Sequence, residues 1–151
     1  MSFNNVMKQN PNAILSHSNL RKTPVRLQVL ELLLRKHEEA LSSHQLESGL
    51  PEVDRITLYR TLRTFEQKGI IHQAFDGTAN AKYALCNEAC TEHHHVDRHA
   101  HFHCSFCGKT VCLDESPQPD VLVPGGFIVQ SSHLILRGSC PDCTFARVEE
   151  R

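Results

Sequence analysis

Two Cys-x-x-Cys pairs constrain this chain of 151 residues more than any other feature. The first pair is Cys104 and Cys107, and the second, Cys140 and Cys143, follows after 32 intervening residues. Thiolate is a soft, anionic ligand, and four thiolates enclose one tetrahedral zinc ion without leaving an open position. We therefore interpret the four cysteines as a structural zinc site. Because the spacer is longer than that of an ordinary zinc ribbon, we expect the site to tie together strands of one small domain.

The other cysteines also favour metal or thiol chemistry over a disulfide framework. The chain has seven cysteines, and its polar N-terminal stretch, Met1 to Asn12, lacks the apolar core of a signal peptide. No run of 18 apolar residues is present, so the sequence predicts no membrane span and no membrane partner. We expect a cytoplasmic protein.

Charge is divided unevenly along the chain. Residues 1–72 contain ten Lys and Arg against seven Asp and Glu, which gives +3, whereas residues 73–151 contain six against ten, which gives −4. A basic half and an acidic half rich in His and Cys suggest two separate tasks, polyanion binding and cation binding.

The basic half has the pattern of a helical domain. Thr23 followed by Pro24 predicts the start of one helix, and Asp54 predicts the N-cap of another. Leu58, Leu62 and Phe65 recur at helical spacing and form the apolar face of that second helix. Its opposite face carries side chains that suit phosphate and base contacts in DNA: Arg55, Tyr59, Arg60 and Arg63.

A β-hairpin is expected directly after these helices. Residues 72–75 and 81–85 have strand character, and they flank the turn sequence DGTAN at 76–80. Helices followed by a hairpin are the layout of a winged helix-turn-helix, in which the last helix enters the major groove. The arginine face could equally be a solvated helix surface, but the hairpin that follows favours DNA binding.

Several motifs together resemble one known family. They are LRKTPVRLQVL at 20–30, ITLYRTL at 56–62, GIIH at 69–72, HAHFHCSFCGK at 99–109 and GSCPDC at 138–143. In this order they resemble the ferric uptake regulator family of bacterial metal-sensing repressors, over roughly residues 13–145.

The resemblance implies an α+β fold with a winged-helix DNA-binding domain at residues 1–85 and an α/β dimerisation domain at 86–151. It implies a homodimer that binds a palindromic operator in double-stranded DNA when a metal occupies a site between the domains. It gives Arg21, Tyr59 and Arg60 roles in DNA contact, and it supports the assignment of the four cysteines to structural zinc. No small-molecule substrate is expected.

The chain departs from iron- and peroxide-sensing members at the regulatory site. Where the resemblance places their other ligands, this chain has Ala40, Ala84 and Cys112, although their two histidines are retained as His99 and His101. Zinc-sensing members use a cysteine at the end of the second hairpin strand and a histidine at the foot of the first. The corresponding residues here are Cys86 and His72.

Thiolate with imidazole favours zinc, whereas oxygen-rich ligand sets suit iron or manganese. We therefore expect the regulatory metal to be Zn²⁺, with Fe²⁺ and Mn²⁺ as alternatives. The predicted ligands are His72, Cys86, His99 and His101, with Cys112 as a rival thiolate.

An insertion at residues 87–98 is longer than the family pattern leads us to expect. Cys90, His93 and His95 could form an additional metal site, or belong to a polar loop that binds metal loosely. His133 lies one residue away from the spacing expected of a further ligand, so no role is assigned to it.

The sequence thus predicts a zinc-responsive repressor and no enzyme. An iron- or peroxide-responsive regulator of the same family is the nearest alternative. A zinc hydrolase is disfavoured because the His-Glu-x-x-His motif is missing, as is the pairing of His-x-Glu with Pro-Cys-x-x-Cys. A thiol oxidoreductase is disfavoured because both Cys-x-x-Cys pairs are assigned to zinc. A metal buffer or chaperone would explain the cysteines and histidines but not the arginine face.

Overall fold

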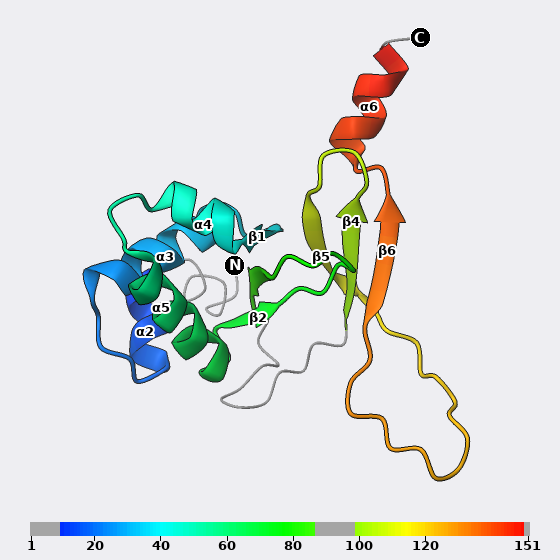
Figure 1. Ribbon diagram of the computed structural model, residues 1–151, viewed down its shortest axis with the longest axis horizontal. Helices are drawn as coiled ribbons and strands as arrows, with labels where there is room; N and C mark the ends of the chain where they lie inside the picture. The colour runs from blue at the N-terminus through cyan, green and yellow to red at the C-terminus, as the bar shows by residue number, and fades with distance from the viewer. Residues whose placement is uncertain (1–9, 87–98, 150–151) are drawn as a thin grey trace.

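The computed structural model describes residues 10–86 and 99–149 (Figure 1). The N-terminal part is helical, and a sheet leads from it to the C-terminal part, as Figure 1 shows. The helices of the N-terminal part are α2 (Pro11–His17), α3 (Pro24–Arg35), α4 (Ser43–Gly49) and α5 (Arg55–Gln67). A last helix, α6 (Pro141–Glu149), begins directly after Cys140 and projects from the end of the sheet.

Side-chain caps fix where the helices begin, as the sequence predicts. Thr23 accepts a hydrogen bond from the Arg26 backbone N–H at the start of α3, and Pro24 occupies the first helical position. Asp54 does the same for α5, accepting from the Thr57 N–H at 2.9 Å. Ser42 caps α4, and its side chain accepts from the Gln45 backbone N–H.

The apolar face predicted for α5 forms the centre of the helical core. Leu58 and Phe65 are fully buried, and Leu62 is 1 % exposed. They belong to one cluster with residues of α3, Val29 and Leu30 among them. Burial of this face turns the opposite, arginine-bearing face of α5 outward.

One six-stranded sheet runs from the helical part to the C-terminal part. Its strands lie in the order β2-β3-β1-β5-β4-β6, and all neighbours are antiparallel except β4 and β6. The predicted hairpin is confirmed by β2 and β3. The strands are β1 (Glu39–Ser42), β2 (Ile71–Gln73), β3 (Lys82–Leu85), β4 (His99–Cys104), β5 (Thr110–Pro117) and β6 (Leu134–Gly138).

The short strand β1 joins the two halves of the sheet. Leu41 pairs with Tyr83 of β3, while Glu39 pairs with Val111 of β5. The sequence gives no strand signal at these four residues, because their pairing depends on partners distant in the chain. The α+β fold class is confirmed, and the division near residue 85 falls within a shared sheet. Within the described ranges, no helix has the length and apolarity needed to cross a membrane.

Truncation of the α5 core should destabilise the protein. Leu62→Ala removes buried methyl groups and leaves a cavity, so we expect a loss of about 2–5 kcal/mol in the free energy of unfolding. Ile56→Ala, on the same helix at a side chain 65 % exposed, should change it by less than about 0.5 kcal/mol. Urea unfolding followed by circular dichroism at fixed metal content measures both. Equal effects of the two substitutions would contradict this packing.

Candidate metal centre

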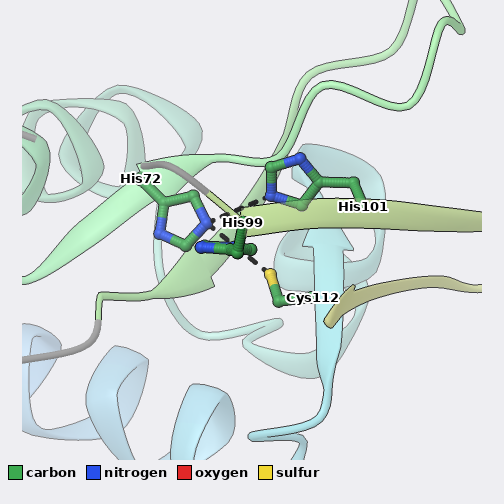
Figure 2. A group of neighbouring side chains, drawn as sticks. All are labelled: His72, His99, His101 and Cys112. Carbon is green, nitrogen blue, oxygen red and sulfur yellow. Dashed lines mark hydrogen bonds between the residues drawn. The ribbon is translucent and has the colours of Figure 1, made fainter. Parts of the chain in front are cut away.

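Three histidines and a cysteine point toward one another beside the helical part (Figure 2). One ligand atom from each of His72, His99, His101 and Cys112 can be chosen so that all four atoms lie within 4.8 Å of one another. Nε2 of His72 lies 3.5 Å from Nε2 of His101 and 3.6 Å from Sγ of Cys112. We call these four residues the His3Cys group.

The group draws on two hairpins. His72 lies in β2, on the hairpin that follows α5. His99 and His101 alternate along β4, so their side chains leave the same face, and Cys112 on β5 is the cross-strand partner of His101. The three imidazoles are at most 4 % exposed, whereas Cys112 is only partly buried. His72 therefore meets three residues that lie 27 or more positions further along the chain.

The distances match those between the ligands of one tetrahedral zinc ion. With Zn–N near 2.0 Å and Zn–S near 2.3 Å, tetrahedral geometry places two nitrogens about 3.4 Å apart and a nitrogen and a sulfur about 3.6 Å apart. The observed separations are 3.5 Å for His72 and His101 and 3.6 Å for His72 and Cys112. These two separations therefore fit a small tetrahedral cation, and the other ligand atoms lie within 4.8 Å of one another.

Asp114 is a residue of this site that the sequence analysis did not identify. Its Oδ1 lies 3.5 Å from Nδ1 of His99. A carboxylate at this ion-pair distance can orient the imidazole ring of a metal ligand. A β-bulge next to His99 shifts the β4–β5 pairing at this point. The signal in the sequence is the two-residue spacing from Cys112, which places Asp114 on the same side of β5.

The structure favours Cys112 over Cys86 as the thiolate of the group. Ala84 is the cross-strand partner of His72, and Cys86 lies two residues further along, where its N–H donates to the Ile70 carbonyl at 2.9 Å. Its thiol is not part of the His3Cys group. The structure therefore brings Cys112, and not Cys86, together with the three histidines.

The four cysteines of the two Cys-x-x-Cys pairs form a second group of ligand atoms within 4.8 Å of one another. Cys104 ends β4, Cys107 follows in a turn, and Cys140 and Cys143 flank the start of α6. The sulfurs of Cys107 and Cys140 are 3.8 Å apart, which is about the separation of two sulfurs on one tetrahedral zinc. This group therefore fits a closed site that fastens α6 to β4.

Backbone N–H groups favour the thiolate form of Cys104 in this second group. Hydrogen bonds from the backbone of Cys107, with a further one from Cys140, lower the pKa of the Cys104 thiol to about 6. Hydrogen bonds to neighbouring sulfurs, first that of Cys140, raise the pKa of Cys143 to about 12. Four crowded sulfurs therefore resist full ionisation unless a cation joins them.

The side chains predicted to contact DNA are all exposed. Arg55, Tyr59, Arg60 and Arg63 lie on the outer face of α5, and Arg21 precedes α3. Arg55 also forms an ion pair with Glu47 on α4, with 3.2 Å between Nε and Oε1.

The remaining residues singled out in the sequence are those of the insertion and His133. The proposed additional ligands Cys90, His93 and His95 lie outside the described residues. His133 lies in neither ligand group, and its ring instead packs on Phe75 with 4.2 Å between centroids.

A winged helix joined through a sheet to two sets of metal-ligating side chains defines the class of metal-responsive regulators. The model of the ferric uptake regulator family matches residues 17–122, and the chain belongs to that family.

Individual relatives extend over most of the chain. It is 31 % identical to the ferric uptake regulation protein of Neisseria meningitidis serogroup A over 150 residues, covering 93 % of this chain and 94 % of the relative. It is 30 % identical to the peroxide operon regulator of Bacillus subtilis, covering 86 % and 88 %. Its fold is similar to that of a zinc uptake regulator solved in complex with zinc and DNA, with a TM-score of 0.62, 21 % identity and coverage of 98 % and 99 %.

Replacing Cys112 should weaken metal binding at the His3Cys group. Cys112→Ser exchanges a soft sulfur for a hard oxygen, and we expect at least about a 10-fold loss of zinc affinity, since even an indirect ligand contact is worth that much. Cys86→Ser provides the matched control and should change the affinity by less than about 2-fold. Chelator competition with the Cys104 group already filled measures both. A larger loss with Cys86→Ser would restore Cys86 as the ligand.

Proposed function

We propose that the protein is a metal-dependent, DNA-binding transcriptional repressor that responds to zinc. The observation that carries the proposal is the composition of the His3Cys group. One ligand, His72, comes from the hairpin of the winged helix, and the other three come from β4 and β5. A site built in this way senses metal by joining two parts of the molecule.

The chain's own residues suggest how binding is transmitted. A divalent ion at the His3Cys group would supply the charge that holds three imidazoles and a thiolate together. His72 lies five residues after α5 ends at Gln67, so fixing His72 also restricts the helix that bears Tyr59 and Arg60. In a homodimer, two such helices about one DNA turn apart can read a palindromic operator. Metal and DNA then raise each other's affinity by the same factor.

Zinc is the regulatory metal that the donor set favours. Three nitrogens and one sulfur form a closed set of four ligands, which suits zinc and sensing rather than catalysis. Relatives of the chain include proteins named for iron uptake and for peroxide response, so Fe²⁺ and Mn²⁺ are the competing regulatory ions. The group of Cys104, Cys107, Cys140 and Cys143 would hold a second, permanent zinc.

The proposal also covers the domains, the partners and the location, as the family resemblance implies. Residues up to about 85 form the DNA-binding domain, and residues 86–151 form the dimerisation domain. The partners are a second copy of the chain and double-stranded DNA, and the location is the cytoplasm. An enzymatic role is not proposed. A metal-buffer function would not explain the exposed arginine face of α5.

A titration of DNA binding with separate metals tests the proposal. Protein that keeps only its structural zinc is bound to an operator selected from a random duplex pool, and Zn²⁺, Fe²⁺ and Mn²⁺ are added in separate experiments. We expect zinc to raise the DNA affinity at the lowest free-metal concentration, since the ligand set includes a thiolate. An equal response to all three metals would contradict zinc selectivity. DNA binding unchanged by any metal would contradict the mechanism.

Removal of one arginine from α5 should weaken DNA binding through charge. Arg60→Ala is expected to lower the affinity and to reduce the slope of log affinity against log salt by about 1, as for one lost phosphate contact. Arg35→Ala, at an exposed arginine that ends α3, is the matched control and should leave the slope unchanged. Electrophoretic mobility shifts at several salt concentrations provide the measurement. Equal slopes for Arg60→Ala and the unaltered protein would exclude this contact.

A further inference from the structure

A second buried polar cluster lies beside the His3Cys group, where the turn of the β2–β3 hairpin meets β4 and β5. The carboxylate of Asp76, 1 % exposed, accepts hydrogen bonds from Lys82 Nζ at 2.8 Å and from Thr110 Oγ1 at 2.6 Å. His103 Nδ1 lies 3.3 Å from the same oxygen. We call Asp76, Lys82, Thr110 and His103 the ionic clasp.

The bonds of the ionic clasp cross between the two hairpins. Asp76 and Lys82 belong to the β2–β3 hairpin, whereas Thr110 is in β5 and His103 is in β4. Lys82 Nζ also donates to Thr110 Oγ1 at 2.7 Å and to the Gly108 carbonyl at 2.8 Å. The bonds that cross between the hairpins join residues 26 or more positions apart in the sequence. All of them are made by groups of the chain, without a metal.

The carboxylate at the centre of the ionic clasp stays ionised. Burial by itself would raise the pKa of Asp76, but hydrogen bonds from Lys82, Thr110 and Thr78 outweigh burial and hold that pKa far below its usual range. A buried charge that loses one of its partners is strongly destabilising, so the hairpin resists leaving this position. The ionic clasp thus favours the docked hairpin through groups of the chain itself.

The ionic clasp and the His3Cys group are neighbours on the same strands. The β4–β5 pair His101 and Cys112 contributes to the metal group, and the next pair on the same face, His103 and Thr110, contributes to the ionic clasp. On the other hairpin, Lys82 lies two residues before Ala84, the partner of His72. Both clusters therefore join the same two hairpins. The ionic clasp does so through charged and hydroxyl side chains, and the His3Cys group does so through side chains that can bind a metal.

The turn itself is shaped for this docking. Gly77 has a φ of +75°, which favours glycine, and a Cβ there would collide with Nη2 of Arg137. The same Nη2 donates to the Asp76 carbonyl at 3.2 Å, so β6 also holds the turn.

We infer that the ionic clasp positions His72 against His99, His101 and Cys112 before metal arrives, an inference that rests on the proposed role of this group as the regulatory site. Thr110 and Asp76 are positioning residues, because they act on the ligands through the docked hairpin. The apparent metal affinity scales with the fraction of molecules whose hairpin is docked. Weakening the ionic clasp should therefore lower metal affinity without changing the ligand set.

Two threonines on one carboxylate provide a matched test. Thr110→Val removes the hydroxyl that links Asp76 to β5. Thr78→Val removes a hydroxyl that bonds the same carboxylate at 2.6 Å from within the turn, without crossing to the other hairpin. Cobalt(II) is titrated against a chelator with dimers that keep their structural zinc, and no DNA is present.

The expected result separates positioning from ligation. Thr110→Val should lower cobalt affinity by about 10-fold, which corresponds to one hydrogen bond to a charged group, and Thr78→Val by less than about 2-fold. The absorption spectrum at saturation should be the same in all proteins, because the His3Cys ligands are unchanged. Equal affinities for the two variants, or an altered saturated spectrum in Thr110→Val, would overturn the inference.

A milder variant covers the case in which Thr110→Val does not fold. Arg137→Gln loosens the turn from an exposed side chain on β6 and should lower cobalt affinity about 3-fold; an unchanged affinity would then overturn the inference. Failure of the proposed regulatory site has a different result, because the unaltered protein, with zinc in its structural site, would then bind no cobalt, and failure of the repressor function would leave DNA binding unchanged by metal.

Discussion

The docking of the β2–β3 hairpin against β4 and β5 is the contact on which the rest of the structure depends. Polar and ionisable side chains are buried in this contact, next to a small apolar cluster of Ala40, Ala74 and Ala84, and burying them is unfavourable unless each finds a partner. Asp76 finds Lys82 and Thr110. The imidazoles of His72 and His101 face each other with a thiol nearby, an arrangement suited to a cation. The same interface thus combines one permanent electrostatic contact with one that metal can complete.

This arrangement explains why a short strand and a closed cysteine site accompany it. β1 pairs with β3 on one side and β5 on the other, so movement of the hairpin is coupled to the sheet. The four cysteines lie together where α6 begins and β4 ends, the strand that carries His99 and His101, so a zinc ion held there would fasten the two elements. In the proposed mechanism, metal then acts on the position of the hairpin relative to β4. The hairpin follows α5 directly in the chain, so a change in its position also moves the exposed arginines of that helix.

Local signals in the sequence were sufficient for the caps of α3 and α5, the buried face of α5, the hairpin and both cysteine pairs. These features depend on spacing within a few residues or on ligand chemistry. The choice between Cys86 and Cys112 could not be made in this way, because it depends on strand register: Cys112 is paired with His101, while Cys86 lies beyond the partner of His72. β1 and the partners of Asp76 were missed for the same reason, since each depends on residues distant in the chain.

X-ray absorption at the zinc edge, on protein carrying two zinc ions per chain, tests the central claim most directly. The account predicts five sulfur and three nitrogen ligands over the two ions, at about 2.3 and 2.0 Å, because four thiolates bind one ion and the His3Cys group binds the other. Cys112→Ser should remove one of the five sulfurs. A total of four sulfurs in the unaltered protein, or five that persist in Cys112→Ser, would contradict the site described for the regulatory metal.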